Sequence, residues 1–238
     1  MTAFVVGTLD IRQALLSVVP HVEPDPELSL FHRVRVGVGP VNVTVSATEG
    51  HTAAHAIVSL VDNEDGEVDV TFDLSPLDVK EILALFKVAK ADEGLGDTLR
   101  LAVDKDHVTI TDVSGLFPGK ALVLPRQADQ DTYPDVPLMI ACHMNAEFIG
   151  VDDRLTVTGP RLKAFAAAAA AYGEPLVLEP TGLSAAFVVH CGESFVGLLM
   201  PIRQDDETRA QISAWRDAWI TRLPSPADPI RLIKEPSS

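Results

Sequence analysis

The chain has 238 residues, of which 47% are hydrophobic and only 5% aromatic, and its formal net charge is -15. This length allows one large domain or two small ones, with a core built mainly from Val, Leu, Ile and Ala. A protein that grips nucleic acid over most of its surface needs an excess of Lys and Arg, so the charge excludes that class and leaves room only for a small basic patch.

The cysteines and the N-terminal residues bear on the compartment. Cys142 and Cys191 are the only cysteines and have no CxxC spacing, so we expect free thiols in a reduced, cytoplasmic protein. The segment MTAFVVGTLDIRQ has no basic stretch followed by a long apolar one. No run of about eighteen apolar residues occurs, so we expect neither export nor a membrane span.

The first part of the chain predicts a strand, a helix and three more strands. A strand over residues 4–9 precedes a helix with Asp10 as its N-cap, and Pro20 ends that helix. Gly39-Pro40 and Gly50 are turn signals. They separate three extended stretches, at 30–38, 41–47 and 55–60.

The same order of elements then restarts twice. Strand 68–74 leads to Ser75 as a cap, Pro76 at the first helical position and a helix to about Lys90. The strands that complete this unit are 99–103, 108–113 and 120–124. The third unit has a strand at 154–158 and a helix opened by Pro160, followed by strands 175–178, 184–190 and 194–200.

Two regions do not follow this order. Residues 127–153 begin with a polar, turn-rich stretch and predict one or two strands and no helix. Residues 205–223 predict an amphipathic helix with Ile212, Trp215 and Trp219, and the Pro-rich end of the chain predicts an extended arm.

The second and third units can be aligned residue by residue. Gly115 faces Gly192 and Pro125 faces Pro201 at an offset of about 76 to 79 residues, which is typical of stacked supersecondary units. The sequence therefore predicts an α+β fold of tandem β-α-β-β-β units, with helices on one face of antiparallel sheets.

Three short motifs carry a family resemblance. They are Ala47-Thr48-Glu49-Gly50-His51, Tyr133-Pro134-Asp135 and Met200-Pro201-Ile202-Arg203. They resemble the ATDGH stretch, the (F/Y)PD motif and the MPxR ending of bacterial DNA sliding clamps, the ring-shaped processivity factors of replicative polymerases. The tandem β-α-β-β-β unit is the building block of these clamps.

The resemblance implies a domain organisation and an assembly. Residues 1–130 would form one clamp-like domain, 131–203 a shortened second one, and 204–238 a C-terminal helix and arm. Clamp rings contain six domains, from two three-domain or three two-domain chains, so we expect a homo-oligomer. The chain shows three half-domain units, and residues 136–153 are too few for the missing half. Either the second domain is cut down or its first helix is replaced, and the helix at 205–223 could fill that place.

The resemblance also implies a hydrophobic groove that receives short peptides from DNA polymerase and clamp-loader-type subunits. Apolar side chains in a preformed pocket suit such peptides. Thr52 and Ala53 stand where the family has Arg and Leu. The candidate groove residues are Gly50, His51, Thr52, Ala53, Val79, Leu198, Met200, Pro201 and Arg203.

A clamp slides because its inner helices attract the phosphate backbone of duplex DNA without reading bases. On the second predicted helix, Lys80, Lys87 and Lys90 lie on one side, opposite the apolar stripe. The candidate DNA-facing residues are these three lysines together with Arg12, Arg161 and Lys163.

Catalysis is not indicated. His51 and His55 in TEGHTAAH suit a structural role better than a zinc site, and no GxSxG motif, phosphate-binding glycine loop or paired carboxylates occur. We expect no enzyme, cofactor or metal. The first hypothesis is a processivity factor that encircles or tethers to DNA, and the alternative is a clamp-fold interaction or regulatory protein that does not encircle DNA.

Overall fold

The computed structural model describes residues 2–28, 30–64, 70–88, 96–127, 132–146, 156–182 and 186–222. The chain divides into two compact units, Met1–Pro201 and Ile202–Ser238. The division into three domains at residues 130 and 203 stays a prediction.

The first unit contains every strand that the structure describes. Its elements, in order, are β1 (Thr2–Gly7), α1 (Thr8–Val18), a 3-10 turn (Val19–His21), β2 (Val34–Val38), β3 (Asn42–Thr48), β4 (Thr52–Asn63), β5 (Val70–Leu74), α2 (Pro76–Leu85), β6 (Thr98–Val103), β7 (His107–Asp112), β8 (Ala121–Pro125), α3 (Val136–Met144), α4 (Gly159–Tyr172), β9 (Leu176–Pro180), β10 (Phe187–Cys191) and β11 (Phe195–Leu199).

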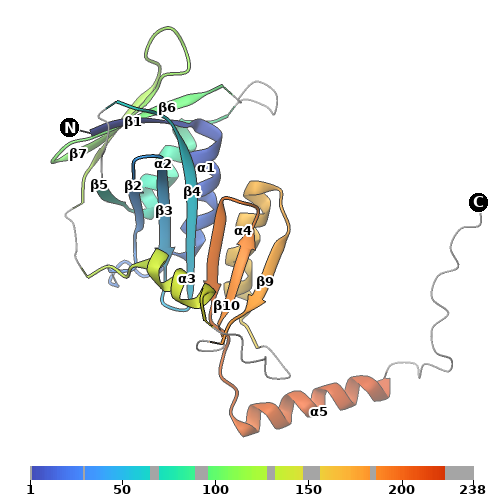
Figure 1. The fold of residues 1–238 in the computed structure, drawn as a ribbon. Coiled ribbons are helices and arrows are strands. Elements are labelled where there is room, and N and C mark those ends of the chain that lie inside the picture. The colour runs from blue at the N-terminus through green and yellow to red at the C-terminus, as the bar shows by residue number, and fades with distance from the viewer. Residues whose placement is uncertain are drawn as a thin grey trace, which may run out of the picture. The chain divides into compact units, whose positions relative to one another are not determined.

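All strand pairs are antiparallel, in the order β5-β2-β3-β4-β1-β6-β7-β8 with β11, β10 and β9 attached through β4. Strand β4 makes this possible because it is long. Its first residues, Thr52–Ala56, pair with β11, and its last ones pair with β1. The predicted α+β class with antiparallel sheets is confirmed (Figure 1).

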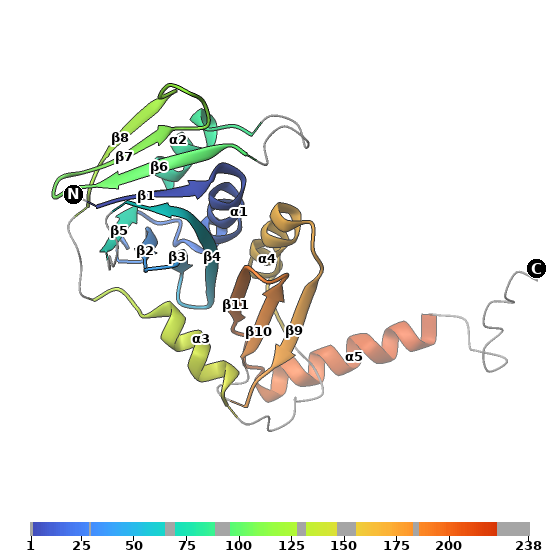
Figure 2. The same ribbon diagram turned by 45° about the horizontal axis from the view of Figure 1, so that its top comes forward.

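Three helices cover one face of the sheets. Side chains from α1, α2 and α4, including Leu15, Ile82 and Phe165, share one core with Ala54 and Ala56 of β4. Successive side chains of a strand point to opposite faces. The helices therefore lie on one side, as predicted, and Figure 2 shows them behind the strands.

Helix α3 is the exception, and the prediction of no helix in residues 127–153 is wrong. Val136 and Ile140 of α3 pack in a second cluster with Ala53 and Leu198, which alternate with the residues of the first core. Helix α3 therefore lies on the opposite face of the sheet. The Asp135 carboxylate caps it by accepting from the Leu138 amide at 2.9 Å.

The first two β-α-β-β-β repeats, which we call the first domain, exchange strands around an internal pseudo-twofold. The first strand of each half pairs with the second strand of the other: β1 with β6, and β5 with β2. The third unit consists of α4, β9, β10 and β11, which we call the half-domain. Residues 156–158, at the end of the predicted strand 154–158, form no strand, and residues 154–155 lie outside the described part. In the first domain, the first strand of one repeat pairs with the second strand of the other repeat. The half-domain has no second repeat that could provide such a partner.

Several predicted boundaries differ from the structure. Helix α1 begins at Thr8 because β1 runs directly into it, so Asp10 lies in its first turn and is not the N-cap. Helix α2 ends at Leu85, well before Lys90. Strand β2 begins only at Val34, whereas β4 spans Thr52–Asn63 and is longer than the predicted 55–60.

The C-terminal unit contains α5 (Asp206–Arg222), close to the predicted 205–223. None of its residues is buried, and Trp215 and Trp219 are exposed. The predicted arm at 223–238 lies outside the described residues. Among the helices that the structure describes, none is long and apolar enough to cross a bilayer.

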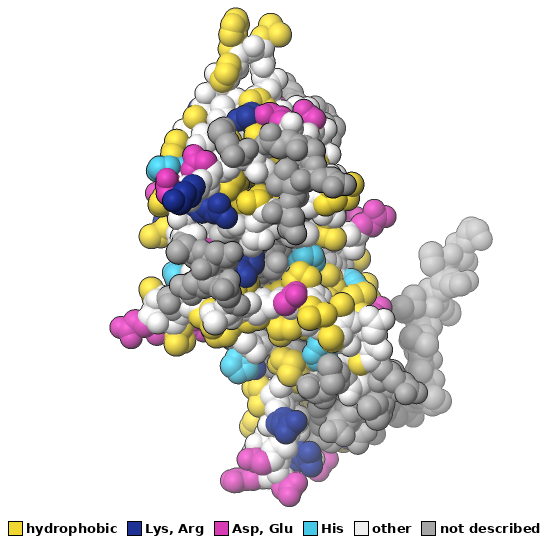
Figure 3. All heavy atoms as spheres, turned by 60° about the vertical axis from the view of Figure 1, so that its left-hand side comes forward, with side chains coloured by type: hydrophobic (Ala, Val, Ile, Leu, Met, Phe, Trp, Pro, Cys, Tyr) yellow, Lys and Arg dark blue, Asp and Glu magenta, His cyan; other side chains and the backbone are white. Residues whose placement is uncertain are grey.

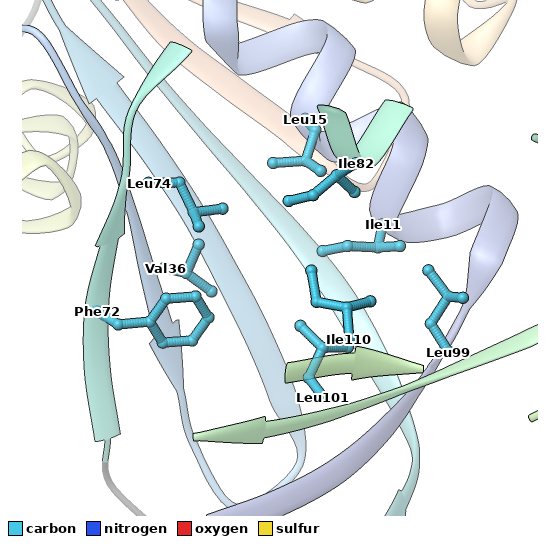
Figure 4. Close-up of a pocket in the computed structure, with 9 residues that line it drawn as sticks. All are labelled: Ile11, Leu15, Val36, Phe72, Leu74, Ile82, Leu99, Leu101 and Ile110. Atoms are coloured by element: carbon cyan, nitrogen blue, oxygen red, sulfur yellow. The ribbon is translucent and has the colours of Figure 1, made fainter. Parts of the chain in front are cut away.

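A small apolar cavity of about 10 Å³ lies in the first domain between α1, α2 and the strands (Figure 4). Its lining includes Ile11, Leu15, Val36 and Ile82. A cavity this small holds at most one water, and an apolar one stays dry. It is a packing gap and is too small for a ligand site.

Candidate peptide groove and DNA-facing residues

A tight turn before β4 positions the first candidate groove residues. Gly50 has a φ of +90°, which only glycine adopts without strain. The Thr52 amide donates to the Glu49 carboxylate at 2.8 Å, and the Gly50 amide donates to Thr48 Oγ1 at 3.0 Å. Glu49, which replaces the Asp of the resembled motif, thus holds the turn closed and leaves His51 exposed.

The end of β11 lies beside this turn. Thr52 pairs with Leu199 and Ala53 with Leu198, and the Met200 amide donates to the His51 carbonyl at 2.9 Å. The backbone of residues 50–53 thus lies beside Leu198, Met200 and Pro201, as the sequence had predicted from motifs about 150 residues apart.

Gly197 allows β11 to approach so closely. A Cβ at this position would lie 2.5 Å from the Ala53 carbonyl oxygen and 2.7 Å from the Phe165 ring, both too short for real contacts. Glycine at 197 is therefore required where the half-domain joins the first domain.

Three candidate groove residues lie elsewhere. Val79 is buried in the first core, under α2 on the other face of the sheet from Ala53 and Leu198. The Thr52 side chain also points into the protein, with its hydroxyl 3.0 Å from the buried His21 Nδ1. Arg203 is exposed and belongs to the C-terminal unit.

Helix α3 supplies the apolar surface that the sequence prediction missed. Its Leu138, Met139 and Met144 are exposed, while its inner side packs on Ala53 and Leu198. Figure 3 shows hydrophobic side chains gathered across the middle of this face. The signal in the sequence was Asp135-Val136-Pro137, an N-cap followed by a proline in the first turn, with Val136 and Ile140 one helical turn apart.

A charged cluster anchors the segment before α3. The Asp73 carboxylate accepts from Arg33 Nη1 and from Arg35 Nε, each at 2.9 Å, and Arg33 and Asp73 are almost fully buried. The Arg35 guanidinium lies 4.5 Å from the centre of the Tyr133 ring. Burial, reinforced by the Asp73 charge, raises the pKa of Tyr133 to about 12. The tyrosine therefore stays neutral and serves as a packing residue.

The candidate DNA-facing residues lie on α1, α2 and α4 with two exceptions. Lys87 follows the end of α2, and Lys90 lies outside the described residues, so the predicted row of three lysines on one helix does not form. Arg12 donates to the carbonyls of Leu83, at 2.7 Å, and Phe86, and burial lowers its pKa. Lys80 and Lys163 are exposed, and Arg161 is half-buried.

The charge on these helices differs from that of the whole chain. They carry four basic residues (Arg12, Lys80, Arg161, Lys163) and three acidic ones (Asp10, Asp78, Glu81). The helical side is thus close to neutral in a chain with a net charge of -15. No group of three or more potential metal-ligating side chains occurs in the part of the chain that the structure describes.

Comparison with known proteins agrees with this geometry at the level of fold. No family profile and no curated sequence matches the chain. Among solved structures, the DNA polymerase sliding clamp of Bacillus subtilis matches with a TM-score of 0.61 and 14% identity, over 85% of this chain and 64% of that one. The DNA polymerase III beta subunit of Thermotoga maritima matches with a TM-score of 0.60 and 12% identity, over 88% of this chain and 67% of that one.

A putative DNA polymerase III beta subunit from Eubacterium rectale also matches, with a TM-score of 0.61 and 10% identity, over 90% of this chain and 68% of that one. The chain thus spans about two thirds of the length of these proteins. It has the fold of the bacterial DNA polymerase sliding clamps.

Proposed function

We propose that the chain is a clamp-type processivity factor that tethers replication proteins to duplex DNA. The observation that carries this proposal is the continuous junction between β4 and β11, with α1 and α4 on the same side of the sheet. A sheet that continues across a domain boundary supports the curved wall that a ring around DNA needs. The near-neutral helical side is where a phosphate backbone meets the least repulsion.

The DNA part of the proposal is tested by retention on DNA. The full chain is incubated with nicked circular and with linear duplex DNA and passed over a gel-filtration column. Retention on circles and loss from linear ends is the expected result. Equal retention on both forms would mean that the protein does not encircle DNA.

Charge reversal on the helices sharpens this test. The double variant Lys80→Glu/Lys163→Glu should weaken DNA association and flatten its salt dependence, because backbone contacts release counterions. The matched control is Lys105→Glu, an exposed lysine in the turn between β6 and β7. If the double variant and the control bind alike, these helices do not face DNA.

The second part of the proposal is a peptide site formed by the turn at 50–51, the Met200-Pro201 segment and the outer side of α3. Apolar side chains of a short peptide would pack on Met139 and Met200, and the exposed His51 would border the site. Met139→Asp should lower the affinity of a fluorescent clamp-binding peptide at least tenfold. Leu77→Asp, an exposed leucine on α2, is the control. Equal binding by both variants would exclude α3 from the site.

The alternative function is a clamp-fold regulator that binds clamp partners without encircling DNA. The net charge of -15 and the half-size second domain favour it. Peptide binding that persists in a chain with no retention on circular DNA would identify this alternative.

A further inference from the structure

The half-domain has one open side. In the first domain, β6 has a neighbour on each edge, β1 and β7, and β2 likewise lies between β5 and β3. Strand β9 occupies the same place in the half-domain, yet within the described residues it pairs with β10 alone. Figure 1 shows β9 at the outer edge of the three strands.

Burial shows what the first domain covers and the half-domain leaves open. Leu101 of β6 and Leu178 of β9 are counterparts in the repeat, with Gly115 facing Gly192 at the same offset. Leu101 is 4% exposed, whereas Leu178 is 39% exposed. The difference arises because β1 and its helix lie against β6, and nothing described lies against the free edge of β9.

The helices repeat this contrast. Ile82 and Phe165 are the seventh residues of α2 and α4, and both are buried. Val79 and Leu162 are the fourth residues of the same helices. Val79 is 1% exposed and Leu162 is 48% exposed. An apolar surface therefore runs from the fourth residue of α4 to the edge of β9.

We propose that a second copy of this chain covers that surface, so that two half-domains form one complete domain around a twofold axis. In the first domain, the first strand of each repeat pairs with the second strand of the other repeat. In a dimer of half-domains, each copy can pair with the other in the same way. The Val157-Thr158 segment of one copy would lie along β9 of the other, and the two α4 helices would face each other.

The chain itself argues for a second copy as the occupant. Between α3 and α4 lie only residues 145–158, too few to build the missing half. The open surface needs an apolar helix and a strand that pairs with β9. A copy of this chain brings the helix α4, and its Val157-Thr158 segment would supply the strand on pairing. A free strand edge with apolar neighbours such as Val177 and Leu178 is a template for pairing. A twofold interface uses the same patch on both copies.

The resulting dimer would contain three domains, two complete ones and one shared. If the proposed ring function holds, on which this step rests, two dimers supply the six domains of a ring. They would meet at β8, whose described residues pair only with β7. Strand β8 is the fourth strand of its unit, and β4 and β11, which join the first domain to the half-domain, are also fourth strands.

The first test is mass in solution, measured by light scattering on the full chain. The expected mass is two or four times 25.5 kDa. Leu178→Lys should raise the dissociation constant at least a hundredfold, because the lysine would be buried in the new sheet. The matched control is Leu77→Lys, since Leu77 is also an exposed leucine and lies on α2 of the complete domain. A monomeric wild type at tens of micromolar, or a Leu178→Lys variant of unchanged mass, would overturn the proposal.

The second test places the contact. In a Cys142→Ser background, chains with Val157→Cys are mixed with chains with Leu176→Cys under mild oxidation, because both side chains lie on the helical face of the sheet. Heterodimers linked by a disulfide are expected, and few homodimers. If only homodimers form, the strand exchange is wrong. An intact oligomer that is not retained on circular DNA would remove the proposed function and leave this inference standing.

Discussion

His21 Nδ1 lies 3.0 Å from Thr52 Oγ1, in the core beside the junction of β4 and β11. The ring of His21 packs edge-on against Phe165 of α4, with 4.6 Å between ring centres. No described residue forms a hydrogen bond with Nε2 of this histidine. One buried, neutral histidine thus links the 3-10 turn after α1, the candidate groove turn and the half-domain.

This burial predicts loss of stability in acid. Burial lowers the pKa of His21 to about 3, whereas the unfolded chain has the ordinary value of 6.5. Below pH 6.5 the unfolded state binds a proton that the folded state rejects, so stability is full above pH 6.5 and falls as the pH drops toward 3. The free energy of unfolding should decrease by about 1.4 kcal/mol per pH unit well below 6.5 from this group alone, or roughly 2 kcal/mol at pH 5.

Urea unfolding at several pH values measures this effect. The His21→Gln variant should show a shallower decline between pH 6.5 and 5 than the wild type. Leu116→Gln, which changes an exposed residue without a titratable group, should keep the wild-type slope. Parallel curves for wild type and His21→Gln would show that His21 does not stay neutral in the fold.

Arg12 is predicted to stabilise α2 and not to bind DNA. Its guanidinium donates to the carbonyls of Leu83 and Phe86 at the end of that helix, where the helix dipole also favours a cation. Arg12→Ala should lower the free energy of unfolding by about 1 to 2 kcal/mol. Lys80→Ala, on the exposed side of α2, should change it by less than about 0.5 kcal/mol. Thermal unfolding of both variants decides between the two roles, and an equal effect would contradict the capping role.

The sequence predicted the repeated units because helix caps and turn residues mark the ends of their elements. Ser75 and Pro76 mark the start of α2, and the capping box with Asp78 is present in the structure. Gly50 and Gly192 adopt the positive φ that their turn positions require. Local chemistry sufficed there, since the caps and turns act within a few residues.

The candidate site was less accessible to sequence reasoning because it depends on contacts between distant residues. Val79 and Ala53 are both buried and apolar, and only their packing into two separate core clusters shows that they lie on opposite sides of the sheet. Helix α3 has the composition of a strand, with Val136, Leu138 and Ile140 alternating, and its Asp135 cap is the only strong local signal. Lys87 fell outside α2 because the helix ends where Arg12 caps it, a contact from a residue 71 positions away from Leu83.

Gly197 is predicted to control the junction between the first domain and the half-domain. Gly197→Ala would place a methyl group against the Ala53 carbonyl and the Phe165 ring, forcing β11 away from β4. We expect a loss of about 2 to 3 kcal/mol in the free energy of unfolding, as for overpacking of a tight core. Gly159→Ala is the control, because a Cβ there meets no atom within 4 Å. Calorimetry that finds both variants equally stable would mean that β11 is not held closely against β4.

Asp73 is predicted to matter far more than a surface carboxylate with a similar arginine partner. Its carboxylate, with an exposed side-chain fraction of 2%, accepts from Arg33, just before β2, and from Arg35 on β2. Arg35 in turn lies against the Tyr133 ring before α3. Asp73→Asn removes the charge that both guanidinium groups face, and breaking a buried pair in this way costs about 3 kcal/mol or more. The control is Glu64→Gln, which breaks the exposed pair with Arg100 and should cost less than about 1 kcal/mol. Urea unfolding gives both values.

Hydrogen exchange should also be faster in α3 for Asp73→Asn only. The reason is that Arg35, which packs on Tyr133 just before α3, loses its Asp73 carboxylate partner. Unchanged protection of α3 would mean that this charged cluster does not support the peptide site.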